Sequence, residues 1–265
     1  MNLEKGITVF SWNLKNQLND RIMTTTVKKN LDDNNYYPQD HLWRQLTDNE
    51  LKLLIDKKPP KEFQTIGFFK TSNSYRKKAE ALLKAYTLRE LNENQKLHLF
   101  TLKYLKSFML KKDHIDIHNI SQKQSNQSTL TTNEGKKIGL HIDSWEKASS
   151  QDRGKVRNRI CINLGKEHRY FLFMNKRIDE LRAKPFSSLN IGTPDHYNRI
   201  YFFLEANPNY KLFRIELKPF EAYIAPTENL FHDGSSLNSK SIDISITARG
   251  YFGIKPRNKY IYYYY

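Results

Sequence analysis

Residues 139–145, Gly-Leu-His-Ile-Asp-Ser-Trp, decide the expected fold. Side chains alternate between the two faces of a strand. An extended chain here therefore points Leu140 and Ile142 into apolar packing and places His141 and Asp143 together on the opposite face. An imidazole and a carboxylate two residues apart can bind one metal ion from the same side. The segment predicts a sheet whose inner face carries metal ligands.

A second stretch, residues 241–250, alternates strictly between apolar and polar side chains. Its apolar face is Ile242, Ile244, Ile246 and Ala248, and its polar face is Asp243, Ser245, Thr247 and Arg249. An exposed edge strand has this pattern, and so does a strand that lines a polar cavity. Arginine suits such a cavity because its planar fork binds a carboxylate through two hydrogen bonds.

A third candidate ligand, His232, lies between these two stretches. Residues 217–226 predict a turn and a short strand that Pro226 ends. The chain then reaches His232 at the mouth of a sheet, and Asp233-Gly234 predicts a turn immediately after it. Two histidines and one carboxylate on one face of an octahedron leave three positions for other ligands, an arrangement typical of non-haem iron oxygenases.

The order His141-x-Asp143, His232, Arg249 resembles the iron(II)/2-oxoglutarate-dependent dioxygenases over roughly residues 114–254. The resemblance implies a double-stranded β-helix, or jelly roll, in which His141, Asp143 and His232 bind Fe(II). It also implies that Arg249 binds the distal carboxylate of 2-oxoglutarate and that O2 is the oxidant. Many members have a serine two residues after this arginine, where this chain has a tyrosine, so we expect Thr247 to supply the hydroxyl.

A rival motif, His114-x-Asp116-x-His118, also places its side chains on one strand face. We prefer His141 as the ligand, because the expected fold needs a strand before the ligand strand and residues 114–120 supply it. The alternative interpretation of His114 and His118 is a solvated strand face.

Other candidate site residues flank these motifs. Residues 157–164 predict a strand on which Arg159 faces the cavity and binds a carboxylate of substrate or co-substrate, with Arg157 as a further substrate-binding residue. The alternative is a surface arginine on a sheet. Trp145 is expected to border the cavity, and the polar loop over residues 121–136 to close over it. A core tryptophan and a solvated connection are the alternatives.

Helices are expected mainly in the first half of the chain. Thr47 to Glu50 form a capping box that predicts a helix to about residue 56. A second helix is expected over 74–89, and Asn92 is expected to cap a third, whose apolar stripe is Leu97, Phe100, Tyr104, Leu105 and Phe108. Residues 176–184 look helical, and residues 195–206 fit helix or strand.

These elements predict an α+β fold in a single domain, residues 1–265. A helical buttress over about 45–112 is expected to support a jelly-roll or cupin-like core over about 113–254. One cysteine, Cys161, excludes an intrachain disulfide and fits a core position. No apolar run is long enough to span a bilayer, and the N-terminus lacks a signal peptide, so we expect a cytoplasmic protein without membrane contact.

The formal net charge of +16 is open to three interpretations. It reflects an AT-rich genome, or docking to an acidic partner such as a carrier protein that bears the substrate, or binding to nucleic acid. Zinc-finger spacing, a Gly-rich phosphate loop and an Arg-rich tract are all missing from the sequence, which disfavours nucleic acid.

The expected function is an iron- and 2-oxoglutarate-dependent oxygenase. It would hydroxylate, desaturate or cyclise at an unactivated carbon of a small polar metabolite, an amino acid or derivative. Within the resemblance, Asp143 argues against halogenation. The alternatives are a nucleic-acid modification enzyme or binding module that uses the basic surface, and a non-catalytic jelly-roll binding protein.

Overall fold

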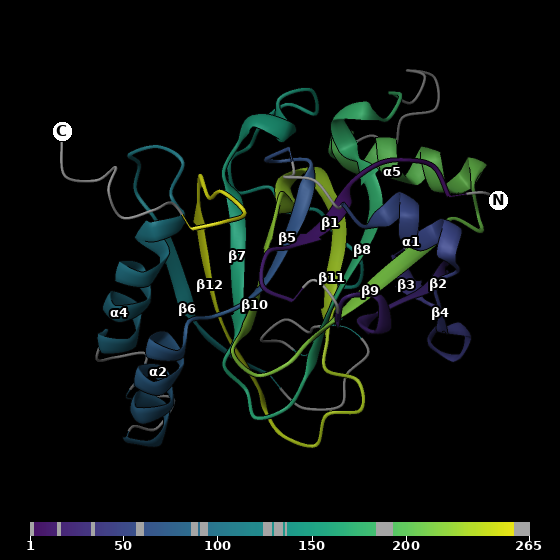
Figure 1. The fold of residues 1–265 in the computed structure, drawn as a ribbon. Helices are drawn as coiled ribbons and strands as arrows, with labels where there is room; N and C mark the ends of the chain where they lie inside the picture. The colour runs from purple at the N-terminus through teal and green to yellow at the C-terminus, as the bar shows by residue number, and fades with distance from the viewer. Residues whose placement is uncertain are drawn as a thin grey trace.

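Two six-stranded β-sheets face each other, and α-helices cover their outer faces (Figure 1). The computed structural model describes residues 3–14, 17–32, 35–56, 61–85, 90, 95–123, 129, 135, 137–183 and 193–256, with backbone only for 118–123. The mixed α+β class expected from the sequence is confirmed.

The first sheet has the strand order β1-β5-β10-β7-β12-β6. Only the pairing of β1 with β5 is parallel; the other pairings are antiparallel. Its strands are β1 (Thr8–Ser11), β5 (Thr65–Lys70), β6 (Asp116–Lys123), β7 (Asn158–Asn163), β10 (Glu221–Ala225) and β12 (Asp243–Gly250). The chain from residue 116 onward thus supplies four neighbouring strands, which β5 and β1 extend on one side.

The second sheet has the order β11-β8-β9-β2-β3, and β4 also pairs with β2. All its pairings are antiparallel. Its strands are β2 (Ile22–Lys29), β3 (Tyr36–Pro38), β4 (Arg44–Gln45), β8 (Arg169–Arg177), β9 (Lys211–Leu217) and β11 (Leu230–Ser235). A single bridge between His141 and His232 adds the segment that carries His141 and Asp143 (residues 139–143, the ligand segment) to the free edge of this sheet, beside β11.

The elements form four layers, helix, sheet, sheet and helix, with an apolar cluster at each of the three boundaries. Helices α2 (Asn73–Ala85) and α4 (Lys96–Leu105) pack on the first sheet, next to Ile160 and Ile246. Phe171 and Phe173 lie in the cluster between the sheets. Helix α5 (Asp195–Ala206) packs on the outer face of the second sheet (Figure 1).

Most of the expected elements are confirmed. Helix α1 (Asp48–Leu54) begins at the predicted capping box, in which Thr47 and Glu50 bond each other reciprocally. The apolar stripe of α4 and the 3₁₀ turn after it packs on the first sheet, as expected. Residues 195–206 are helical. Residues 86–89, the cap expected at Asn92 and most of the loop expected over 121–136 lie outside the described residues.

Two local expectations are wrong. Residues 176–177 complete β8 and are followed by only one 3₁₀ turn, Ile178–Glu180, instead of the expected helix. Asp233 and Gly234 do not turn the chain, because they lie inside β11 opposite Leu172 and Phe171 of β8. Cross-strand pairing outweighs the local turn preference of Asp-Gly here.

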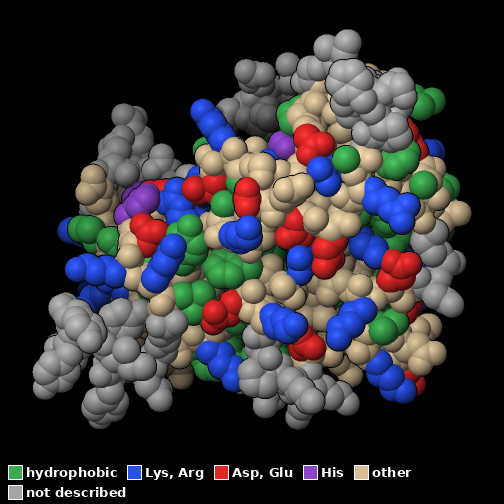
Figure 2. All heavy atoms as spheres, turned by 90° about the horizontal axis from the view of Figure 1, so that it is seen from above, with side chains coloured by type: hydrophobic (Ala, Val, Ile, Leu, Met, Phe, Trp, Pro, Cys, Tyr) green, Lys and Arg blue, Asp and Glu red, His purple; other side chains and the backbone are tan. Residues whose placement is uncertain are grey.

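The stretch 45–112, expected to be helical, also contains β5, which lies within the first sheet. The net positive charge is not segregated on the face seen in Figure 2, where Lys and Arg side chains are interspersed with Asp and Glu. None of the helices in the described ranges is long and apolar enough to cross a membrane.

Candidate metal centre and its pocket

Three candidate ligands come together where the ligand segment meets β11. Single ligand atoms of His141, Asp143 and His232 all lie within 4.8 Å of one another. Nε2 of His141 lies 3.8 Å from the Asp143 carboxylate, and Nε2 of His232 lies 3.9 Å from it. One ion with bonds of about 2.0–2.2 Å can bridge such separations. In the described part of the chain this is the group of His, Cys, Asp and Glu residues that fits a metal ion.

The ligand segment is extended but is not the regular strand expected from the sequence. His141 and His232 exchange a pair of backbone hydrogen bonds, each 2.8 Å long, which form an isolated bridge. The backbone N–H groups of Leu140 and Asp143 also donate to Tyr36 O and Thr227 O, each at 3.1 Å. The predicted alternation nevertheless holds, because Leu140 and Ile142 are buried in the outer apolar cluster. After Asp143 the chain leaves the sheet, so Trp145 lies on a loop with 58% of its surface exposed. The core interpretation of Trp145 is therefore wrong.

Backbone carbonyls fix the orientation of both imidazoles. Nδ1 of His141 bonds Gly139 O at 2.9 Å, and Nδ1 of His232 bonds Leu230 O at 2.8 Å. A carbonyl oxygen only accepts, so each Nδ1 carries the proton and each Nε2 carries a lone pair directed at the triad. This is the second contact that metal-binding histidines commonly make.

The electrostatics of the triad favour the protonation states that a metal requires. Burial lowers the pKa of both His141 and His232, and in His232 the nearby His141 lowers it further. Burial alone would raise the pKa of Asp143, but the charge of Arg159 and the two imidazoles outweigh it and hold that pKa below its ordinary value. Neutral imidazoles and an ionised carboxylate are the forms that bind metal ions. The donor set therefore fits a divalent cation.

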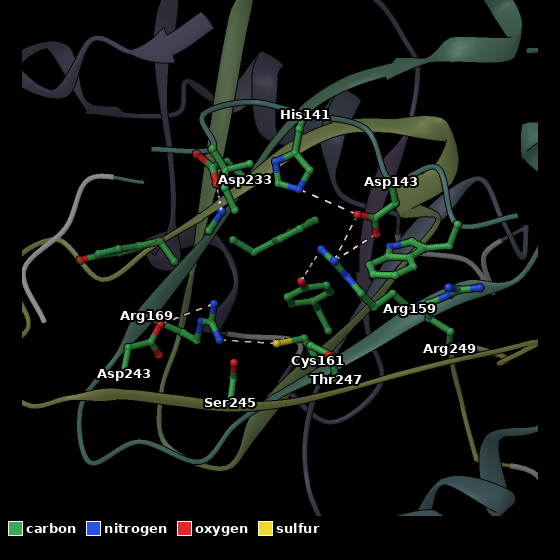
Figure 3. A pocket seen from close by; sticks show the side chains of 16 residues that line it. His141, Asp143, Arg159, Cys161, Arg169, Asp233, Asp243, Ser245, Thr247 and Arg249 are labelled. Atoms are coloured by element: carbon green, nitrogen blue, oxygen red, sulfur yellow. Dashed lines mark hydrogen bonds and ion pairs between the residues drawn. The ribbon is translucent and has the colours of Figure 1, made fainter. Parts of the chain in front are cut away.

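A cavity of about 440 Å³ opens between the sheets beside the triad (Figure 3). His141 and Asp143 line one side of it, and the polar face of β12 lines another, including Ser245 and Thr247. The polar face of residues 241–250 thus borders a cavity, and β12 lies between β6 and β7 instead of at an exposed edge. Cys161 is buried, as expected, but also contributes to the cavity wall.

Three arginines line this cavity, and they differ in their partners. Arg159, on β7, lies among the ligands: its guanidinium is 3.0 Å from Asp143 Oδ2 and 2.8 Å from His232 Nε2. Arg249, at the end of β12, bonds Glu146 and lies under the Trp145 ring, 5.3 Å from its centroid. Both residues therefore already have close partners.

The third arginine, Arg169 at the start of β8, was not singled out from the sequence. It is 5% exposed, its closest carboxylate, that of Asp243, is 3.6 Å away, and Nη1 is 3.6 Å from the sulfur of Cys161. The separation from Asp243 is long for a buried cation, and the contact with Cys161 is a hydrogen bond to sulfur. Figure 3 shows it across the cavity from the triad. The strand alternation that puts Phe171 on the inner face was the signal that would have found Arg169.

Arg157 and the rival motif lie together outside this cavity. Arg157 donates to Glu146 at 2.7 Å and to Asp116 at 2.6 Å, and its guanidinium is 2.8 Å from His114 Nε2. His114 is largely exposed and also contacts Asp113. Of the motif's members, the His118 side chain lies outside the described residues. His141, Asp143 and His232 thus lie together beside a cavity, whereas His114 lies in a surface network of charged residues.

A buried pair that the sequence did not reveal holds the ligand segment. Arg153 donates through Nη1 to the backbone oxygens of Asp143 and Glu228, each at 2.8 Å. The Glu228 carboxylate accepts from the backbone N–H of Trp145 at 2.6 Å and of Glu146 at 3.2 Å. No periodicity or spacing marks these residues, because their partners are main-chain atoms of distant segments.

Comparisons with models of known protein families and with curated proteins find no match for this chain.

Proposed function

We propose that this protein is an iron(II)- and 2-oxoglutarate-dependent oxygenase that acts on a small polar metabolite. One observation carries the proposal: a His-Asp-His triad of suitable spacing borders a cavity lined by three guanidinium groups. A bound divalent metal would supply oxygen activation, and His141, Asp143 and His232 would hold it.

Strand pairing supports the double-stranded β-helix. Counting the ligand segment as a strand, eight strands follow one another from β6 to β12. The first pairs with the last, the second with the seventh, the third with the sixth and the fourth with the fifth. Such nested pairing is that of one long hairpin wrapped into two facing sheets, which is the jelly-roll arrangement.

The cavity charges suit an anionic co-substrate. Its lining contains Arg159, Arg169 and Arg249 together with three aspartates, Asp143, Asp233 and Asp243. A divalent cation at the triad adds two positive charges, so a dianion such as 2-oxoglutarate would restore neutrality. The substrate would enter at the open side of the cavity, past Trp145.

Arg169 is our proposed partner for the distal carboxylate of 2-oxoglutarate, and the buried Ser245 hydroxyl also lines the cavity, near Arg169 in Figure 3. The resemblance in sequence pointed to Arg249 instead. Glu146 already binds Arg249 and would have to be displaced, whereas the carboxylate closest to Arg169 is 3.6 Å away and its hydrogen bond is to the sulfur of Cys161. Binding to Arg169 therefore breaks less existing structure.

Turnover of 2-oxoglutarate tests the proposal. Purified protein with Fe(II), O2 and 2-oxoglutarate should form succinate even without a substrate, at a slow uncoupled rate. Asp143→Ala should form none, while His114→Ala, a variant of the exposed rival motif, should keep the rate of the unmodified protein. Equal succinate formation by Asp143→Ala, or none by the unmodified protein, would refute the proposed function.

A further inference from the structure

A buried ion pair ties together the two segments that carry the candidate metal ligands. The Arg153 and Glu228 side chains are 1% and 2% exposed, and Nη1 of Arg153 lies 3.5 Å from Glu228 Oε2. Glu228 lies in the 3₁₀ turn Thr227–Asn229, directly before the strand with His232. Arg153 lies in another 3₁₀ turn, Arg153–Lys155, ten residues after Asp143.

The contacts of this pair are concentrated on residues 143–146, the loop that begins at the candidate ligand Asp143. Arg153 holds the backbone oxygen of Asp143, and its Nη2 donates to Ser144 Oγ at 3.0 Å. Glu228 holds the next two backbone N–H groups, those of Trp145 and Glu146. Every residue from 143 to 146 therefore has one atom bonded to this pair.

The surroundings leave the pair little room to move. Nη2 of Arg153 also bonds the buried His196 on α5, at 2.9 Å from its Nδ1. A Cβ on the neighbouring Gly154 would lie 2.5 Å from Asp179 Oδ2 and 3.1 Å from Asn229 Nδ2. The turn with Arg153 is therefore packed tightly against the turn with Glu228.

We propose that Arg153 and Glu228 are positioning residues that set the place of the Asp143 carboxylate in the metal centre. Two charged side chains without water contact are costly to bury unless their hydrogen bonds are satisfied. Here most of those bonds go to the backbone on both sides of a metal ligand and to the turn that leads to His232. Among the described residues, Nε of Arg153 and Oε2 of Glu228 have no hydrogen-bond partner. Partners of this kind orient the ligands of metal sites and commonly change metal affinity by roughly 10–100-fold. The inference rests on the metal site of the proposed function.

The experiment measures Co²⁺ binding alone, by equilibrium titration and by the visible absorption of the bound ion. Arg153→Met removes all the fork contacts and should weaken Co²⁺ binding at least tenfold. Its absorption spectrum should shift toward that of Asp143→Ala, because the carboxylate no longer holds its place. Arg153→Lys keeps the positive charge without the planar fork, so its Co²⁺ affinity should lie between those of the unmodified protein and Arg153→Met.

A matched control separates positioning from general destabilisation. Arg21 and Glu221 form another buried pair, with contacts of 2.8 and 2.7 Å and side chains 8% and 4% exposed. The partners of Arg21 are Gln17 and Glu221, both away from the triad. Arg21→Met should lower the thermal midpoint and leave the Co²⁺ affinity and spectrum unchanged.

Each outcome decides the matter. Unaltered Co²⁺ affinity and spectrum in folded Arg153→Met would overturn the positioning role, as would an equal loss in Arg21→Met. If Arg153→Met does not fold, Glu228→Gln replaces it: it keeps an oxygen for the loop N–H groups, loses the charge, and should weaken Co²⁺ severalfold, while unchanged affinity would overturn the role. Absence of Co²⁺ binding in the unmodified protein would instead refute the metal site itself.

Discussion

Nη2 of Arg159 donates a hydrogen bond to Nε2 of His232 over 2.8 Å. The direction follows from the other side of the ring, where Nδ1 holds the proton because it bonds Leu230 O. The guanidinium therefore uses the lone pair that a metal ion would use, and it pairs with Asp143 as well. Arg159 and a metal ion compete for two of the three ligands.

Replacing Arg159 should therefore strengthen metal binding. Arg159→Met removes the competing donor and a like charge next to the ion. A hydrogen bond from a charged group contributes about 1.5–3 kcal/mol, so the Co²⁺ affinity should rise by roughly tenfold or more in an equilibrium titration. A lower affinity in the variant would mean that Arg159 supports the triad instead of competing with the ion.

The three ligands should each be required for metal binding. His141→Ala, Asp143→Ala and His232→Ala should each abolish stoichiometric Fe(II) or Co²⁺ binding, measured by metal analysis after gel filtration. His114→Ala should bind one equivalent, because His114 lies in the surface network with Arg157. Retained metal binding in His141→Ala together with loss of binding in His114→Ala would identify His114 as the ligand instead.

The two arginines proposed for the co-substrate can be separated by their charge-conserving variants. Arg169→Lys keeps the charge but loses the fork, so the dissociation constant for 2-oxoglutarate should rise about tenfold. Arg249→Lys should change it less, because Glu146 already holds that guanidinium. Isothermal titration of the metal-loaded protein gives both numbers. A larger effect for Arg249→Lys would restore the assignment made from the sequence.

The buried His196 should make stability depend on pH. Burial, reinforced by Arg153, lowers the pKa of His196 to about 4 from 6.5. As the pH falls, the unfolded chain therefore takes up this proton before the folded protein does. The contribution of neutral His196 to the free energy of unfolding is complete above pH 6.5 and is lost as the pH falls toward 4. The difference corresponds to roughly 3 kcal/mol. Urea unfolding of His196→Gln between pH 7 and 4 should show a shallower loss than the unmodified protein; parallel curves would contradict this.

Patterns of alternation predicted the parts of the site that lie on extended backbone. Within the expected stretch 241–250, residues 243–250 form β12 with the polar face toward the cavity, and Leu140 and Ile142 face the apolar cluster. The capping box at Thr47 likewise marks the start of α1. These patterns involve only residues that are close together in the sequence, so they can be recognised without knowing the fold.

The wrong turn prediction and the site residues that sequence patterns missed depend on contacts between distant segments. Asp233-Gly234 has the composition of a turn, yet pairing with β8 keeps it extended. The role of Arg153 in holding Asp143 O depends on where a 3₁₀ turn packs, and Arg169 depends on which face of β8 meets the cavity. Strand alternation groups Arg169 with Phe171 on one face of β8, but which face meets the cavity, and where the turn with Arg153 packs, depend on the whole fold.

The central claim, that one metal ion and 2-oxoglutarate bind together at the triad, is tested most directly by visible spectroscopy without oxygen. Fe(II) and 2-oxoglutarate added anaerobically to the protein should produce the weak visible charge-transfer band of the chelate, saturating at one equivalent of each. The band should be missing in Asp143→Ala and in His232→Ala. No band with the unmodified protein under saturating iron and 2-oxoglutarate would contradict the account.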